Sequence, residues 1–300
     1  MKYCKKAFSS YDEQLSFVNA CEREFEEKLS AAVEQVCNVE GIKVIGLSGP
    51  SCSGKTTTAK KLIDTLSKMG REVHLVSIDN FFKDTTKPSD DDESVDFDSI
   101  NALDLEAFEK CINEIVNCEP THIPHFDFIT GKRTGYTEIQ SDPTDLYIFE
   151  GIQAVYPEVT SMLQRFKSIS IYIRANSAIS LDGTVFEGNE IRLMRRIVRD
   201  YNFRGADPEY SMFLWQSVRA NEEKNIFPNA DSCEIKIDST MAYEINLLSQ
   251  FLRPLLLSVP EDSEYIDEVN NLLSKTEGVE AVPQSMIPDN SLYYEFIKRT

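Results

Sequence analysis

The chain has 300 residues, which is enough for one large domain or two small ones with a substantial core. Its 50 acidic and 31 basic residues give a formal charge of -19, so we expect neither nucleic acid nor a membrane surface as a partner, while a homo-oligomer stays compatible with it. Seven scattered cysteines without a C-x-x-C pair, and no signal-like or membrane-length apolar run, predict a reduced, cytoplasmic protein.

The first 40 residues predict an N-terminal helical segment. Over residues 12–37, apolar side chains recur about one helical turn apart, and charged residues fill the opposite face. We interpret this pattern as a helix packed on the core, with a partner-binding helix as the alternative. The remaining chain is divided into a main domain over 41–258 and an acidic C-terminal extension over 259–300.

A glycine-rich loop follows the first predicted strand, residues 42–47, and precedes a predicted helix over 57–69. It matches the phosphate-binding pattern G-x-x-x-x-G-K-[ST]. In a strand–loop–helix unit, backbone N–H groups and the positive helix end point at one anion. Lys55 can then reach the β- and γ-phosphates of ATP, and the Thr56 hydroxyl can ligate Mg²⁺. The predicted ATP-binding residues are Gly49, Pro50, Ser51, Cys52, Ser53, Gly54, Lys55, Thr56 and Thr57.

The second predicted strand, residues 72–78, ends at Asp79. In open α/β sheets, ligands bind beyond the carboxyl ends of the strands, so Asp79 is expected near the phosphates. A carboxylate there can take the proton from an attacking hydroxyl, as a kinase base does. The alternative is a strand-end aspartate that caps a turn.

The next segments combine a polar loop, a helix, a hairpin and a strand. Residues 83–98 are polar and acidic and predict a mobile loop, and residues 103–116 predict a helix. Residues 122–128 and 131–136 predict a hairpin with aromatic side chains on one side. The apolar run 146–151 predicts a strand whose Glu150 could hold Mg²⁺, or its water shell, across from Thr56.

After a further strand over 168–173, residues 176–188 form a small-residue loop, and a predicted helix then carries the main basic cluster. Its arginines recur at three- and four-residue spacing, so most of them share one stripe. Arginine stabilises spread phosphoryl charge, which favours a lid over about 176–207; a salt-bridged surface is the alternative. The cluster comprises Arg192, Arg195, Arg196, Arg199 and Arg204.

A helix over 208–224, a fifth core strand over 233–237 and a closing helix over 242–257 complete the main domain. Five strands that alternate with helices predict an α/β fold with a parallel sheet covered on both faces. Beyond Pro260 the chain is acidic and less periodic, which predicts a small appendage or a partly disordered tail.

Between about residues 42 and 257, the chain resembles the uridine kinase and phosphoribulokinase family of P-loop kinases. The resemblance rests on six motifs in the family's order and spacing: Gly49–Thr56, Ile78–Phe82, Asp96–Asp98, Ile123–Phe128, Phe149–Ile152 and Arg195–Asp200. It implies a P-loop NTPase fold with a five-stranded parallel sheet, an arginine-bearing lid and a small β-hairpin over the acceptor site. It also implies an ATP- and Mg²⁺-dependent kinase that phosphorylates the 5′-hydroxyl of a nucleoside such as uridine or cytidine.

The resemblance implies roles for individual residues. Asp79 would be the base on the sugar hydroxyl, and Asp98 and Arg196 would hold the ribose hydroxyls. Arg199 and Arg204 would act on the phosphates from the lid, with Glu150 near Mg²⁺. The acceptor pocket would be lined by aromatic and aliphatic side chains, namely Phe82, Phe97, Phe126, Phe128 and Ile152.

Two departures bear on the substrate. Well-known uridine–cytidine kinases place a Tyr and a His against the pyrimidine, where this chain has Phe126 and Gly131, and one of their lid arginines falls at Ala206. The alternatives are therefore a same-fold kinase for a sugar phosphate or pantothenate-like alcohol, and a non-catalytic nucleotide-binding regulator. A guanine-reading N-K-x-D segment is missing from the sequence, and Asp79 would have no purpose in a simple switch.

Overall fold

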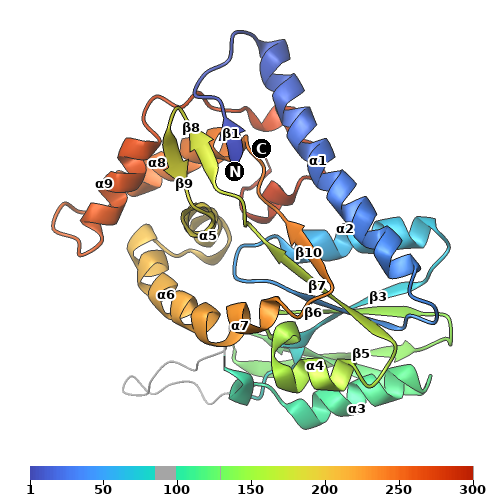
Figure 1. The fold of residues 1–300 in the computed structure, drawn as a ribbon. Coiled ribbons are helices and arrows are strands. Elements are labelled where there is room, and N and C mark those ends of the chain that lie inside the picture. Colours follow the sequence, from blue (N-terminus) through green and yellow to red (C-terminus); the bar gives the residue numbers. More distant parts are fainter. Residues whose placement is uncertain (85–98, 129, 300) are drawn as a thin grey trace.

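The computed structural model describes residues 1–84, 99–128 and 130–299 (Figure 1). Most of the predicted loop over 83–98, including Phe97 and Asp98, lies outside these residues. The central sheet has five parallel strands in the order β10-β7-β2-β6-β3. These strands are β2 (Val44–Ser48), β3 (Val73–Ser77), β6 (Leu146–Glu150), β7 (Ser168–Arg174) and β10 (Ile235–Asp238). The predicted five-stranded parallel sheet is confirmed.

Alternating side chains of this sheet enter two separate cores. Ile45 and Ile148 pack with the helices α1 (Tyr11–Cys37), α2 (Lys55–Lys68), α5 (Gly188–Arg204) and α8 (Glu244–Leu256). Val44 and Tyr147, one residue earlier on the same strands, pack with α3 (Leu105–Val116) and α4 (Pro157–Leu163) on the other face. The period-2 alternation of a strand therefore places helices on both faces, as predicted (Figure 1).

The predicted hairpin is formed by β4 (Pro120–Asp127) and β5 (Lys132–Gln140), which pair antiparallel with a bulge between His125 and Phe126. It is attached to the short 3-10 helix η1 (Ile78–Phe81) that follows β3, because Asn80 Oδ1 accepts from the Phe126 N–H at 3.2 Å. This contact holds the aromatic end of the hairpin close to the segment that carries Asp79.

The predicted small-residue loop over 176–188 is instead a second hairpin. Strands β8 (Ile179–Leu181) and β9 (Thr184–Phe186) pair antiparallel, and the N-terminal strand β1 (Lys2–Cys4) adds parallel to β8. The tight turn consists of Asp182 and Gly183 with φ of 47° and 85°, the left-handed conformation that Asp-Gly hairpin turns adopt. Helix α5 follows directly, and α6 (Pro208–Asn221) continues through a π-helical turn, η4 (Glu222–Ile226), into α7 (Phe227–Ala230).

Both ends of the chain are built onto the main core. Glu22 of α1 is buried and accepts from the hydroxyls of Tyr243 and Ser291, so it joins α1, the start of α8 and the C-terminal segment. The extension contains α9 (Ile266–Lys275), and its last residues include the buried side chains of Leu292 and Phe296. These belong to the same core cluster as α2, so the expectation of an appendage or a disordered tail is wrong for this segment.

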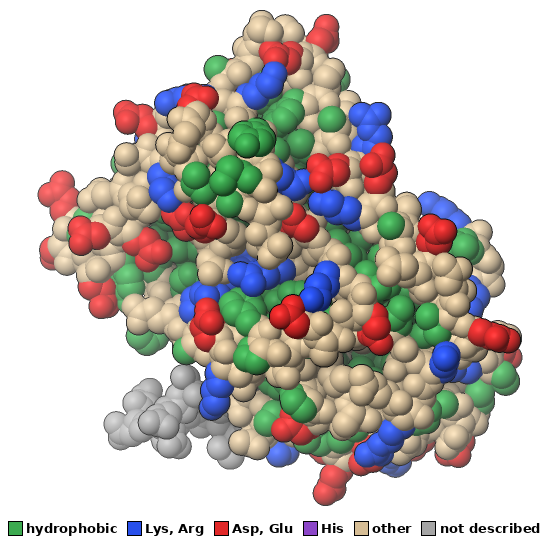
Figure 2. Space-filling view, viewed as in Figure 1, with side chains coloured by type: hydrophobic (Ala, Val, Ile, Leu, Met, Phe, Trp, Pro, Cys, Tyr) green, Lys and Arg blue, Asp and Glu red, His purple; other side chains and the backbone are tan. Residues whose placement is uncertain are grey.

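Charge is distributed unevenly over the face shown in Figure 2. Acidic side chains gather over α9, whereas lysine and arginine side chains gather near the middle of the view, between α5 and α7. Among the described residues, none of the helices combines the length and apolar character needed to cross a membrane.

Candidate active site

Three neighbouring strands bring the predicted catalytic groups to one edge of the sheet. In the strand register, Leu47 lies beside Glu150, and Ser77 lies beside Glu150 on its other side. The phosphate loop begins two residues after Leu47, and Asp79 comes two residues after Ser77. Because adjacent strands are about 4.8 Å apart, the loop, Glu150 and Asp79 meet at the carboxyl edge.

The phosphate loop has a backbone shape that its glycines permit. A Cβ at Gly49 would lie 2.1 Å from the Ile173 carbonyl oxygen, so a larger residue would force β2 and β7 apart. Gly54 has φ of 92° and caps the start of α2, and Cys52 also has a positive φ of 59°. The Lys55 ammonium donates to the Pro50 carbonyl oxygen at 3.1 Å, which keeps its charge over the loop.

Helix α5 supports the loop from behind with two fully buried arginines. Arg195 donates to the Cys52 carbonyl oxygen at 3.2 Å and makes a bidentate pair with Glu244, with Nε and Nη2 at 2.8 and 3.0 Å from its oxygens. Arg192 donates to the Ser51 carbonyl oxygen at 3.1 Å and pairs with the buried Glu222. These two arginines fit neither the lid nor a salt-bridged surface, because both are buried; their salt bridges fix the loop, and they are not free to act on phosphates.

The other three arginines of the cluster converge on Asp200, which is buried. Arg199 Nη2 lies 2.6 Å, Arg196 Nε 3.3 Å and Arg204 Nε 3.5 Å from its carboxylate oxygens. Arg196 also donates to the Ser51 Oγ at 3.2 Å, which connects the cluster to the phosphate loop. Arg204 is 58% exposed and has room to reorient, whereas the side chains of Arg196 and Arg199 are held.

Two carboxyl groups at the sheet edge have raised pKa values. Burial raises the pKa of Asp79, against the opposing effect of the Lys55 and Arg204 charges. Burial also raises the pKa of Glu150 to about 7; the Lys55 charge opposes this shift, and the Asp79 and Glu295 charges add to it. Carboxylates that repel one another beside an ammonium and a guanidinium form a site suited to a polyanion with a divalent cation.

The donor set fits Mg²⁺ bound together with phosphate oxygens. Thr56 is exposed at the start of α2 and offers a hydroxyl, and Glu150 offers a carboxylate at the adjacent strand end. Across residues 1–84, 99–128 and 130–299, no group of three or more His, Cys, Asp or Glu side chains could hold a metal ion by itself.

Next to the segment that carries Asp79, three phenylalanines form an edge-to-face cluster. Ring centroids lie 5.5 Å apart for Phe82 and Phe126, 5.8 Å for Phe82 and Phe128, and 5.2 Å for Phe126 and Phe128. Phe82 is buried, while Phe128 is 55% exposed at the end of the hairpin. Ile152 packs beside a different cluster, around Tyr156 and Tyr172, so the structure does not place it within this aromatic group.

The hairpin is fastened to the sheet edge by Arg133, which the sequence interpretation did not single out. Its guanidinium donates to the carbonyl oxygens of Phe82 and Phe81 at 3.1 and 3.0 Å and to Asp104 at 3.1 Å.

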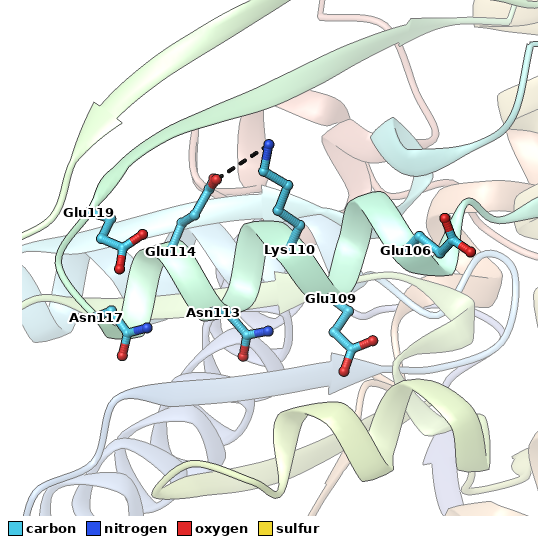
Figure 3. A pocket seen from close by; sticks show the side chains of 7 residues that line it. All are labelled: Glu106, Glu109, Lys110, Asn113, Glu114, Asn117 and Glu119. Atoms are coloured by element: carbon cyan, nitrogen blue, oxygen red, sulfur yellow. Dashed lines mark ion pairs between the residues drawn. The ribbon is translucent and has the colours of Figure 1, made fainter.

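A hollow of about 430 Å³ runs along the outer side of α3, where Lys110 pairs with Glu114 at 3.6 Å (Figure 3). Its lining lies within 106–119 and includes none of the predicted site residues.

Sequence reasoning also missed Asp200 as the hub of the arginines and Glu295 as a contact of the phosphate loop. Asp200 lies beside Arg199 in the sequence and four residues after Arg196, so its helical spacing could have indicated the pairing. Glu295 accepts from the Thr57 N–H and hydroxyl at 3.3 and 3.1 Å. This contact joins residues 238 positions apart, and nothing local in the sequence indicates it.

A parallel sheet with a phosphate loop, two carboxylates at its carboxyl edge and an arginine helix behind the loop defines a P-loop protein of the kinase type. A model of the Phosphoribulokinase / Uridine kinase family matches residues 44–246. The chain belongs to this family, and it is a phosphotransferase with a hydroxyl group as acceptor.

Two curated relatives are a uridine kinase and a uridine-cytidine kinase. Uridine kinase of Borrelia turicatae is 30% identical over 217 residues, which are 71% of this chain and 96% of that protein. Uridine-cytidine kinase C of Dictyostelium discoideum is 26% identical over 235 residues, 78% of this chain; the match spans about half of that longer protein, 46%. A solved structure described as a possible uridine kinase from Bacillus stearothermophilus is also similar, with 18% identity and a TM-score of 0.49. The match covers 72% of this chain and 100% of the solved chain.

Proposed function

We propose that the protein is an ATP-dependent nucleoside kinase that transfers the γ-phosphoryl group to the 5′-hydroxyl of a uridine- or cytidine-like nucleoside. The observation that carries the proposal is the strand register, which puts Asp79 and Glu150 beside the phosphate loop in a chain related to proteins named uridine kinase. The small-molecule acceptor is the partner, and a cytoplasmic location is part of the same proposal.

In the proposed reaction, Asp79 accepts the proton of the 5′-hydroxyl while that oxygen attacks the γ-phosphorus. The bond between the γ-phosphorus and its bridging oxygen breaks, and ADP leaves with the electron pair. Burial raises the pKa of Asp79 and thereby makes its carboxylate a better base, while the nearby charges of Lys55 and Arg204 limit this shift.

On the donor side, backbone N–H groups of residues 49–57 would bind the phosphates, and Lys55 would leave the Pro50 carbonyl oxygen for the β- and γ-phosphates. A bound Mg²⁺, held by Thr56 and Glu150, would neutralise phosphate charge. Arg199 and Arg204 lie on Asp200 at the end of α5, from which they would contribute positive charge to the transferred group.

On the acceptor side, we assign the ribose hydroxyls to Asp98 and Arg196 and the nucleobase to the aromatic cluster of Phe82, Phe126 and Phe128, with Phe97 and Ile152 as further lining. Phenylalanine rings offer a stacking surface to any base. The positions that read the pyrimidine in well-known uridine–cytidine kinases are Phe126 and Gly131 here, which have no polar side-chain atoms. The ribose requirement should therefore be strict and the base requirement comparatively loose.

The test is steady-state kcat/KM for uridine, cytidine, deoxyuridine and a purine nucleoside, with a sugar phosphate and pantothenate as other alcohols. We expect the loss of the 2′-hydroxyl to cost more than the exchange of the base, because a site that hydrogen-bonds a hydroxyl rejects the analogue that lacks it. Activity on uridine and cytidine alone would overturn the loose base requirement. Turnover of another alcohol, without any nucleoside reacting, would overturn the nucleoside assignment and favour the same-fold alternative.

A further inference from the structure

The C-terminal segment lies on the phosphate loop and places a carboxylate where the loop binds anions. The 3-10 helix η6 (Leu292–Glu295) ends at Glu295, whose Oε2 accepts from the Thr57 backbone N–H at 3.3 Å and from the Thr57 hydroxyl at 3.1 Å. The first intrahelical hydrogen bond of α2 is made by the Thr58 N–H, to the Gly54 carbonyl oxygen at 3.0 Å. The Thr57 N–H is therefore one of the free donors at the positive end of α2.

These free donors are the groups that cradle phosphates in a loop of this type. A carboxylate is an anion that can take the place of a phosphate oxygen at such a helix end, and a charge-assisted hydrogen bond is stronger than a neutral one. Glu295 and a donor phosphate would thus need the same Thr57 donors, and their negative charges would also repel each other.

The segment around Glu295 is held firmly. Leu292 is buried against the loop, with its Cδ1 at 2.7 Å from the position of a Cβ on Gly54. The Arg195 guanidinium lies 5.7 Å from the Tyr293 ring centroid and 5.3 Å from that of Phe296, and Asn202 Nδ2 of α5 donates to the Phe296 carbonyl oxygen at 3.0 Å. The backbone of the segment is therefore fixed, whereas the Glu295 side chain is only partly buried and can rotate away.

We propose that Glu295 is a built-in competitor for the donor nucleotide, which occupies the phosphate donors of Thr57 and must swing away before the nucleotide binds. The C-terminal segment thereby lowers the affinity for ATP, and any ligand that draws Glu295 away would raise it. This inference rests on the proposed donor site, but not on the identity of the acceptor.

The decisive variant is Glu295→Gln, which keeps the shape of the side chain and removes its charge. The neutral amide competes less strongly for the Thr57 donors than the carboxylate does, so we expect the Kd for Mg·ATP to fall about tenfold, which corresponds to about 1.4 kcal/mol. Calorimetry without acceptor measures this, with tripolyphosphate as a second probe that contacts only the phosphate site. In turnover, KM for ATP should fall in the same direction as the Kd.

The matched control is Glu277→Gln, which removes the same charge from an exposed position of the C-terminal extension and should leave the Kd unchanged. An unchanged or weakened affinity in Glu295→Gln would overturn the proposal, since Glu295 would then be a structural contact or a ligand of the nucleotide. If neither the parent protein nor Glu295→Gln binds ATP or tripolyphosphate, the proposed competition is overturned as well. Tighter ATP binding without phosphorylation of any nucleoside would leave it standing and overturn only the proposed acceptor.

Discussion

The donor and acceptor sides of the site are built in opposite ways. On the donor side, Cys52 is 3% exposed, and the buried Arg192 and Arg195 hold the carbonyl groups of the loop. On the proposed acceptor side, Phe128 is 55% exposed at the end of a hairpin that Arg133 joins to the carbonyl groups of Phe81 and Phe82. In the proposed kinase, phosphate binding would therefore be fixed by the core, while the choice of acceptor would depend on surface segments that can vary without disturbing the core.

The largest effect is expected from Lys55→Ala, which removes donor-side charge alone. The lysine is only partly buried and donates to the Pro50 carbonyl oxygen of its own loop, so the fold should survive. Loss of a donor to the charge that develops in transfer should lower kcat by about 10²–10³-fold or more and weaken ATP binding. Turnover assays and thermal melts against Lys60→Ala, an exposed lysine of the same helix, measure both. A parental rate would contradict the assignment of the loop.

The next largest effect is expected from Asp79→Asn, which affects the proposed transfer of the acceptor proton during phosphoryl transfer. The amide keeps the shape and loses the proton acceptor, so kcat should fall by about 10²-fold or more while ATP affinity changes little. Single-turnover measurements at saturating acceptor isolate the chemical step from product release. If that step proceeds at the parental rate, Asp79 is not the base, and its alternative role as a turn cap becomes the better explanation.

The sequence predicts features that have a local signal better than features that depend on contacts between distant parts of the chain. The placement of the phosphate loop, Asp79 and Glu150 at one edge of the sheet was predictable from strand periodicity, glycine spacing and sheet topology, whereas their roles stay predictions. The hairpin over 179–186 was missed although its Asp182-Gly183 turn was visible in the sequence. Leu292, Tyr293 and Phe296 lie within five residues, a stretch too short for periodicity to indicate a buried segment, and their burial depends on α1, α2 and α5, which are distant in the chain.

The different roles of the arginines in α5 could not be predicted for a second reason. Arg192, Arg195 and Arg199 are chemically alike and share one helix, so sequence spacing could not separate loop supports from candidate phosphate ligands. Only their partners distinguish them: Glu222 and Glu244 lie 30 and 49 residues away, whereas Asp200 is adjacent to Arg199. Phe97 and Asp98 lie outside the described residues, so their roles stay predictions.

A pair of substitutions on α5 tests this division. Arg195→Met leaves the buried Glu244 without its partner and should lower the free energy of unfolding by about 3–5 kcal/mol. Arg199→Ala should destabilise less and should lower kcat about tenfold or more, because its charge would act on the transferred group. Urea denaturation and steady-state kinetics on both variants compare them. Equal stability losses, with kcat unaffected in Arg199→Ala, would make all of these arginines structural.

The smallest effect concerns stability and comes from Glu150. Its pKa is raised from an ordinary value of 4.5 to about 7, chiefly by burial, so the folded protein binds this proton more tightly than the unfolded chain. Stability contributed by the protonated carboxyl is present at low pH and is lost as pH rises from 4.5 to about 7. A shift of this size corresponds to at most about 3 kcal/mol at 1.36 kcal/mol for each pKa unit.

Glu150→Gln removes this titration and keeps the shape. In EDTA and without nucleotide, the variant should be more stable than the parent at pH 8 by up to about 3 kcal/mol, and the gain should shrink toward zero near pH 4.5. Urea unfolding across this range measures it, with Glu119→Gln as the control at an exposed position. A pH-independent difference would mean that Glu150 is already ionised and stabilised by Lys55 in the folded protein. The same variant should lose Mg²⁺-dependent turnover, because the carboxylate that costs stability in the free protein is the group proposed to hold the cation.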